Sequence, residues 1–160
     1  MNYAVAGSKC GTDITFTDDD GRERNELSNA NTTYCDKYGR LYDWETAMTV
    51  CPGASGWRLP NKAEWDELVE FAGGKEIAGK YLKSKNWDGE DKFGFSALAG
   101  GRGDQKGSYF NQARSYGYWW SASESSKSSA YSWCMLSGYD IARYEDINKG
   151  YLYSVRCVKD

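Results

Sequence analysis

The stretch from residue 57 to residue 65, Trp-Arg-Leu-Pro-Asn-Lys-Ala-Glu-Trp, constrains the fold more than any other part of the chain. Asn61 can cap a helix with its side-chain oxygen, and Glu64, three residues later, can accept from the backbone N–H of the cap. Pro60 comes just before the cap and disfavours an earlier helical turn. An apolar stripe with the spacing of a helix follows, formed by Trp65, Leu68, Val69 and Ala72. Because Gly73-Gly74 ends this pattern, we predict a helix over residues 61–72.

A second helix is predicted just upstream, beginning after Asp43, whose carboxylate can cap it. Its buried stripe is formed by Trp44, Ala47, Met48 and Cys51, again at i, i+3, i+4 and i+7. Both helices fall within residues 41–83.

After residue 115 the apolar residues recur with period two, which is typical of half-buried strands. Tyr131, Trp133 and Met135 alternate with Ser132 and Cys134. Nearer the C-terminus, an alternating set is formed by Tyr151, Tyr153, Val155 and Cys157, with Leu152, Ser154 and Arg156 between them. We therefore expect antiparallel strands in this part of the chain.

We expect one domain over residues 1–160, because 160 residues is the length of a single domain. It divides into a polar N-terminal region (1–40), the two helices (41–83), a long irregular loop (84–115) and the strands (116–160). Helices followed by strands favour an α+β fold over a repeated βαβ fold. A loop as long as residues 84–115 is usually functional or poorly ordered.

The composition excludes several classes of function. The net charge is −3 without a basic cluster, which argues against nucleic-acid binding. The chain contains no histidine, which excludes histidine general-base catalysis and most zinc sites. No apolar run of about 18 residues occurs, so we predict no transmembrane segment. No secretory signal peptide is visible, and we expect any such signal to lie outside this chain.

Large aromatic rings are expected to supply much of the core, because aromatic residues make up 16% of the chain, with 7 Trp and 13 Tyr. The residues predicted to be buried are Trp44, Met48, Trp57, Leu59, Trp65, Leu68, Phe95, Leu98 and Val155.

Several segments resemble, in order, those of a bacterial protein family. They are Cys35–Trp44, Val50–Pro52, Gly56–Trp65, Phe93–Leu98, Gly100-Gly101, Gly117–Ser121 and Tyr153–Val158. Over nearly the whole chain this order resembles the Fibrobacter succinogenes major paralogous domain, which shares the Arg-Leu-Pro…Glu-Trp signature with the formylglycine-generating enzymes. The resemblance implies a C-type lectin-like fold, in which two helices flank small twisted antiparallel sheets and a long irregular region carries the ligand surface. It also implies a bacterial protein that is secreted or displayed at the cell surface.

The five cysteines are an odd number, so at least one is unpaired within a monomer. The C-type lectin pattern implies a disulfide between Cys51 and Cys157. A second bridge, Cys10–Cys35, would tie down the polar N-terminal region, and Cys134 would then be the odd cysteine. The alternative is that all five are buried free thiols of a cytosolic protein.

Calcium is the one cofactor for which the sequence offers candidates. Asp88, Glu90 and Asp91 could bind it, because calcium prefers carboxylate and carbonyl oxygens on a loop. The alternative is a solvated acidic turn. The calcium motifs of sugar-binding C-type lectins, Glu-Pro-Asn or Gln-Pro-Asp with Trp-Asn-Asp, do not occur.

A ligand surface is predicted on the long loop and the strand after it, because irregular backbone on a rigid scaffold commonly carries function. The candidate residues are Trp87, Asp88, Arg102, Tyr109, Phe110 and one of Trp119 and Trp120. Neighbouring residues of a strand point to opposite faces, so one of the two tryptophans is expected in the core and the other as a stacking platform. The alternative is that these aromatic side chains pack beneath the loop.

The sequence favours binding over catalysis. The formylglycine-generating enzymes hold copper with paired cysteines late in the chain, whereas here Cys134 stands alone once Cys157 is assigned to a bridge. We therefore expect an extracellular binding module whose partner is a carbohydrate or a surface protein. The alternatives are a structural cell-surface protein and a degenerate enzyme of the formylglycine-generating type.

Overall fold

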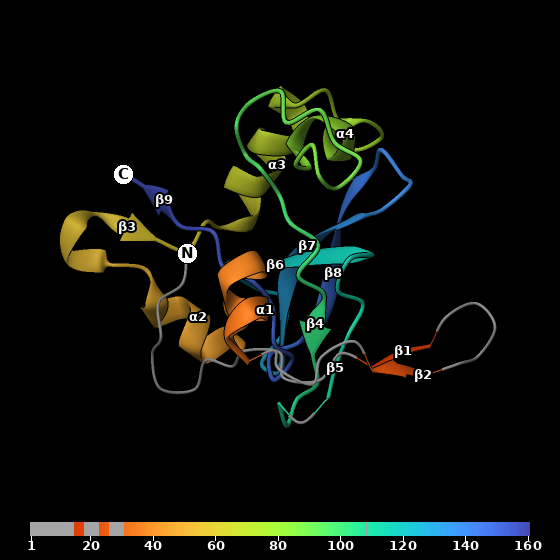
Figure 1. Cartoon of the computed structure of the whole chain (residues 1–160). Coiled ribbons are helices and arrows are strands. Elements are labelled where there is room, and N and C mark those ends of the chain that lie inside the picture. The colour runs from red at the N-terminus through yellow and green to blue at the C-terminus, as the bar shows by residue number, and fades with distance from the viewer. Residues whose placement is uncertain (1–14, 18–22, 26–30, 108) are drawn as a thin grey trace.

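In the structure, a computed structural model, short helices are combined with small antiparallel sheets, which agrees with the predicted α+β class (Figure 1). The structure describes residues 15–17, 23–25, 31–107 and 109–160. In chain order the elements are β1 (Thr15–Thr17), β2 (Glu23–Asn25), α1 (Asn31–Tyr38), α2 (Trp44–Val50), the 3₁₀ helix η1 (Gly53–Ser55), β3 (Trp57–Arg58), α3 (Lys62–Phe71), α4 (Ala78–Leu82), β4 (Arg102–Gly103), β5 (Phe110–Asn111), β6 (Tyr116–Glu124), β7 (Ser129–Leu136), β8 (Ala142–Asn148) and β9 (Val158–Lys159).

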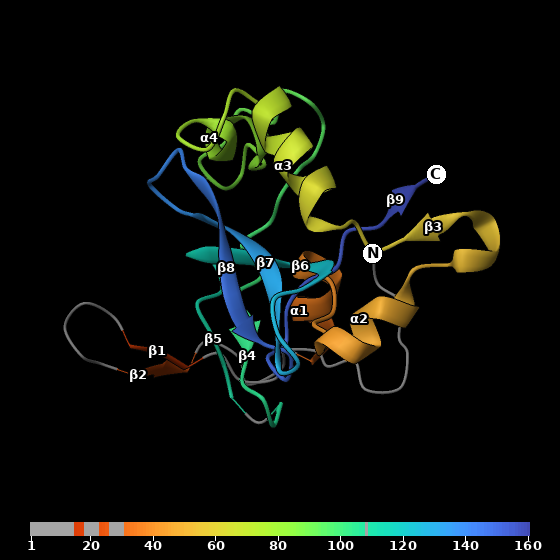
Figure 2. The same ribbon diagram turned by 180° about the vertical axis from the view of Figure 1, so that it is seen from behind.

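The centre of the fold is the antiparallel sheet β6-β7-β8 (Figure 2). Trp119 of β6 lies opposite Trp133 of β7, which in turn lies opposite Tyr144 of β8. Three further pairs of short strands surround this sheet: β1 with β2, β3 with β9, and β4 with β5. The pairing of β3 with β9 brings the C-terminal segment beside the start of α3.

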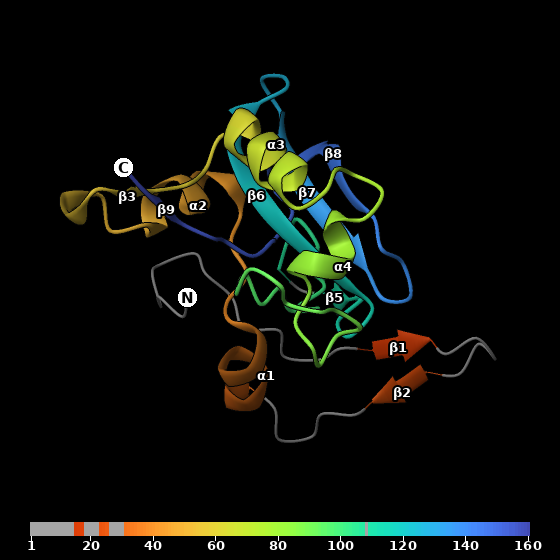
Figure 3. The ribbon, with the colours of Figure 1, turned by 90° about the horizontal axis from the view of Figure 1, so that it is seen from above.

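Helices cover both faces of the central sheet. On one face lies α3 (Figure 3). This helix contributes Trp65, Val69 and Ala72 to a core with Trp119 and Trp133. On the other face, α2 packs its own apolar stripe against the sheet; this core includes Trp44, Ala47, Val50, Tyr118, Trp120, Cys134 and Tyr153. The alternation along β6 therefore sends Trp119 and Trp120 into two different cores, and neither is exposed.

The two predicted helices are present, and their caps are those read from the sequence. The Asn61 side chain accepts from the Glu64 N–H, and the Glu64 carboxylate accepts from the Asn61 N–H, which completes a capping box. The Asp43 carboxylate accepts from the backbone N–H of Thr46 at 2.7 Å and caps α2. Helices α1 and α4 were not predicted, because α1 begins with the weak helix formers Asn-Thr-Thr and α4 has only five residues.

The buried stripe of α2 differs from the prediction by one residue. Met48 is 43% exposed, and Val50 is buried in its place. The inward positions are Trp44, Ala47, Val50 and Cys51, so Met48 falls on the outer border of this short helix.

The C-terminal segment is extended but forms no long strand, in contrast to the prediction. Residues 152, 153 and 154 make single bridges to Gly103, Tyr42 and Trp119, respectively. Because each bridge goes to a different part of the chain, no neighbouring strand runs beside the whole segment, and regular pairing is limited to β9.

The loop after α4 folds back on that helix. The backbone N–H groups of Glu90, Asp91 and Lys92 donate to carbonyl oxygens of residues 80, 83 and 81. Trp87 is thereby packed beneath the loop, with its ring centroid 6.4 Å from that of Trp119. Further along, β4 and β5 form a small hairpin within the same region.

The predicted core is confirmed at four positions and wrong at two. Trp44, Leu59, Trp65 and Val155 are buried. Trp57, Leu68 and Phe95 are half-buried. Besides Met48, Leu98 is exposed, at 38%, because it alternates with the buried Ala97 and Ala99.

The Cys51–Cys157 disulfide is present and joins the end of α2 to the C-terminal segment across 106 residues of sequence, with a Cα–Cα distance of 5.8 Å. The expected Cys10–Cys35 bridge involves Cys10, which lies outside the described residues. Cys134 is a buried free thiol, and burial raises its pKa to about 12. Such a thiol is unreactive at neutral pH.

Removing the Cys51–Cys157 bridge with a Cys51→Ala, Cys157→Ala double variant is expected to lower the free energy of unfolding by about 4–5 kcal/mol, because the unfolded chain regains the freedom of a long loop. Urea denaturation measures the loss. Peptide mapping without reductant is expected to recover the two cysteines in one linked pair; a free Cys51 thiol in the native protein would contradict the assignment.

Trp65→Ala is expected to cost about 3–5 kcal/mol of stability, because it leaves a cavity among three other rings. Those rings, Phe95, Trp119 and Trp133, have centroids 5.9–6.4 Å from that of Trp65. Phe71→Ala is the matched control on the same helix, since Phe71 is 70% exposed, and should cost less than about 1 kcal/mol. Equal losses in the two variants would show that the assigned face of α3 is wrong.

Candidate functional site

The residues predicted to form a ligand surface are not gathered on one surface. Trp87 and Phe110 are buried beneath the loop, in different parts of the core. Trp119 and Trp120 are both buried as well. The expected stacking platform is therefore absent at these two positions, because a helix covers each face of the sheet. For these aromatics the structure agrees with the alternative prediction, packing in the interior.

Arg102 and Tyr109 lie on the β4–β5 hairpin. The guanidinium of Arg102 lies over the rings of Tyr118 and Tyr151, at 5.9 and 5.5 Å from their centroids. Its Nε also donates to the Asn111 side chain at 3.3 Å. Tyr109 is 45% exposed. Of the predicted surface, these two residues are the ones left accessible beside Asp88.

Asp88 holds the turn between β7 and β8. Its carboxylate accepts from the Ser137 hydroxyl at 2.6 Å and from the Gly138 N–H at 3.0 Å, and these hydrogen bonds lower its pKa. The buried Lys83 secures the same turn, because its ammonium donates to the Leu136 and Tyr139 carbonyls. Asp88 thus has a structural role in this turn.

The three calcium candidates have separate partners. Asp88 binds the β7–β8 turn, Glu90 pairs with Lys80 at 3.1 Å, and Asp91 accepts from the hydroxyl and the N–H of Ser96. Within the described residues, no group of three histidine, cysteine or acidic side chains is placed to hold a metal ion. This arrangement lends the calcium prediction no support.

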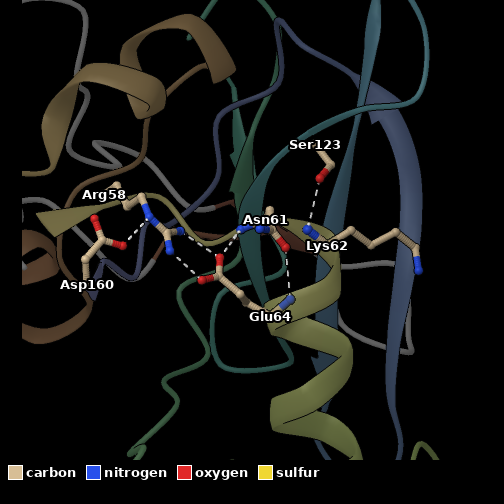
Figure 4. Close-up of polar contacts among 6 residues, drawn as sticks. All are labelled: Arg58, Asn61, Lys62, Glu64, Ser123 and Asp160. Carbon is tan, nitrogen blue, oxygen red and sulfur yellow. Dashed lines mark hydrogen bonds and ion pairs between the residues drawn. The ribbon is translucent and has the colours of Figure 1, made fainter.

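The Arg58–Glu64 signature joins two distant parts of the chain (Figure 4). The guanidinium of Arg58 donates to both Glu64 carboxylate oxygens, at 2.6 and 2.7 Å, and its Nε donates to Asp160 at 2.7 Å. Glu64 also completes the capping box with Asn61. These contacts with Arg58 and Asn61 lower the pKa of Glu64. The most recognisable motif of the sequence thus holds the start of α3 beside the C-terminal segment. We call the contacts of Arg58 with Glu64 and Asp160 the Arg58 bridge.

An apolar cleft of about 280 Å³ lies beside the Arg58 bridge. We call it the α3 cleft; it lies between the first turns of α3, the loop around residue 95 and the C-terminal segment, and its lining is formed by Pro60, Glu64, Trp65, Leu68, Phe95, Arg156, Cys157 and Val158. Aromatic and aliphatic side chains dominate this lining, as they do in most ligand pockets.

Arg156 is the cation of the cleft. Its guanidinium lies 4.5 Å from the centroid of the Phe95 ring and donates to the Phe95 carbonyl at 2.7 Å. Phe95 in turn contacts Trp65 edge-on, at a centroid distance of 5.9 Å. Burial lowers the pKa of Arg156, although the guanidinium stays charged at neutral pH.

Arg156 also borders a second, smaller cavity of about 70 Å³. The remaining lining of this cavity comes from Tyr38, Arg40, Leu98, Trp119, Ser154 and Val155. One arginine therefore lies between an apolar space and a polar one.

Sequence reasoning missed the α3 cleft, because its walls come from segments near residues 60, 95 and 156. A charged residue between the inward-facing Val155 and Cys157 was a signal that could have directed attention to it. The period-two pattern instead favoured an ordinary half-exposed strand, in which an arginine needs no special explanation.

The fold and the cleft define a disulfide-braced α+β domain with an apolar pocket beside an arginine. A family model described as the Fibrobacter succinogenes major domain matches residues 1–159, and the chain belongs to this family. No match is found among curated proteins or among solved structures. In the described part of the chain, none of the helices has both the length and the apolar character needed to cross a membrane.

Arg58→Met is expected to raise the pKa of Glu64 toward its usual value near 4.5, because the main hydrogen bonds to the carboxylate are lost. In the wild type the lowered pKa contributes stability above that usual value, and this contribution is lost as the pH falls through the folded-state pKa. Carbon-detected NMR titration of the Glu64 carboxyl measures the change.

Lys62→Met is the matched control, since Lys62 pairs with Asp66 at 2.7 Å on the same helical turn. It should leave the pKa of Glu64 unchanged. An unaltered pKa of Glu64 in Arg58→Met would show that the Arg58 bridge does not form in solution.

Proposed function

We propose that this protein is a binding module that holds an apolar group of its ligand in the α3 cleft. The observation that carries the proposal is the cleft itself, a space of about 280 Å³ beside the half-buried side chains of Phe95 and Leu68. Ligand pockets generally measure roughly 300–1,000 Å³. The α3 cleft is therefore suited to one side chain or one ring of a larger partner.

The walls of the cleft are held from two sides, which supports a binding role. Cys157 lines the cleft and is bonded to α2 through the disulfide. Glu64 lines it as well and is held by Arg58, which also binds Asp160. A pocket whose walls are fixed before binding loses less conformational entropy when the ligand enters.

The partner classes that we propose are a surface protein or a carbohydrate. An apolar side chain of a protein would contact the lining directly, and a sugar ring could stack its apolar face on Phe95. The disulfide is consistent with an oxidising, extracellular compartment. We accordingly propose that the domain acts in secretion or at the cell surface.

A structural role without a small ligand is the second candidate. The burial of Trp87, Phe110, Trp119 and Trp120 favours it, because these large rings stabilise the core and leave little aromatic surface on the long loop. In that case the α3 cleft would bind neither an apolar side chain of a protein nor a sugar ring.

Leu68→Trp separates the two candidates, because an indole at this position is expected to fill the cleft. The probes are N-acetyl-leucinamide, N-acetyl-phenylalaninamide and methyl β-glucoside, and the readout is the NMR shift of the Val158 methyl groups, which line the cleft. We expect at least one probe to shift the Val158 signals in the wild type and to lose this effect in Leu68→Trp.

Phe71→Trp is the matched control, since it enlarges an exposed position one turn further along α3. It should bind like the wild type. If none of the probes moves the Val158 signals, or if Leu68→Trp binds as the wild type does, the structural role is favoured instead.

A further inference from the structure

The charge of Arg156 is the feature of the α3 cleft that its apolar lining leaves unexplained. A guanidinium has five N–H donors in a planar fork. One of them is taken by the Phe95 carbonyl, and no other hydrogen bond from this guanidinium to a described residue is present. Placing such a group against an apolar wall costs free energy unless its charge is compensated.

The carboxylates around the cleft supply that compensation only in part. Asp91 acts on Arg156 through space and favours its charged form, while the two oxygens of Asp91 accept hydrogen bonds from Ser96. Glu64 lines the same cleft, but both of its oxygens accept from Arg58. Its negative charge is thereby paired outside the cleft, which leaves Arg156 as the unpaired charge inside.

We propose that the α3 cleft selects ligands in which a carboxylate is attached to an apolar body, and that Arg156 binds this carboxylate. The apolar body would occupy the space between Leu68 and Phe95, and the carboxylate would take the remaining N–H groups of the guanidinium. A planar guanidinium binds a carboxylate through two parallel hydrogen bonds. This inference rests on the proposed binding function and names its ligand chemistry.

The lining favours such a ligand over a neutral sugar. The hydroxyl groups of a sugar ring need several hydrogen-bonding partners, whereas the polar side chains of the cleft are Arg156 and the already paired Glu64. A carboxylate on an apolar body needs one cationic partner and an apolar wall, and the cleft contains both. The carboxylate could belong to a small organic acid or to the C-terminus of a peptide, since the recognition chemistry is the same.

The test compares acids with their neutral amides. The probes are 3-phenylpropanoate against 3-phenylpropanamide, and acetyl-Gly-Gly-Leu with a free carboxylate against the same peptide amidated. Binding is followed at pH 7 by the shifts of the Leu68 and Val158 methyl groups, which also locate the ligand. We expect the acid of at least one pair to bind about 10–100 times more tightly than its amide, as charged hydrogen bonds do. The pair with the larger ratio identifies the source of the carboxylate.

Arg156→Gln should abolish the preference for the acid while neutral probes still bind. Lys127→Gln is the matched control, because it removes one positive charge from an exposed turn and should keep the preference. If Arg156→Gln does not fold, Arg156→Lys together with the wild-type comparison decides the matter, since the lysine variant keeps the charge and should keep part of the preference.

Two outcomes would overturn the inference while the proposed function stands: equal binding of acid and amide by the wild type, or an acid preference that survives in Arg156→Gln. Failure of every probe, charged or neutral, to shift the signals of the cleft would reject the binding function itself.

Discussion

Burial of β6 and β7 on both faces is the constraint on which the rest of the structure depends. A sheet covered by α3 on one side and by α2 on the other needs large side chains at successive positions, and Trp119 and Trp120 meet this need in two separate cores. Because neither face of these strands is open, the rings of Trp119 and Trp120 are out of reach of a ligand. The α3 cleft lies instead at the boundary between α3 and the C-terminal segment.

The contacts that hold the C-terminal segment in place also shape the cleft. Arg58 binds the start of α3 to Asp160, and the disulfide binds Cys157 to the end of α2. Both contacts lie within or next to the lining, so stability and ligand binding would be difficult to alter independently here. The Arg-Leu-Pro…Glu-Trp motif, by which the family resemblance is most readily noticed, therefore has a structural role in joining α3 to the C-terminal segment. It says little about the ligand.

Local signals in the sequence predicted local structure well. The caps at Asp43 and Asn61 depend on residues three positions apart, and both helices begin where these caps place them. The Cys51–Cys157 bridge followed from the family resemblance and is present. The fate of Trp119 and Trp120 could not be read in this way, because it depends on which helices cover the sheet. The cleft has the same difficulty, since Leu68, Phe95 and Arg156 meet only through the tertiary fold.

The alternation along the C-terminal segment has a consequence for changes of chain length. Val155 and Cys157 belong to the core around α2, and Arg156 between them borders both cavities. Single bridges, in place of a long ladder, hold this segment, so its sidedness depends on the odd-even phase of its residues. Inserting one residue between Arg156 and Cys157, with Cys157 held by its disulfide, would turn the side chain of Arg156 toward the core around α2 and take that of Val155 out of it. A change of two residues would keep every side chain on its own side, so this end of the domain should tolerate length changes in pairs far better than singly.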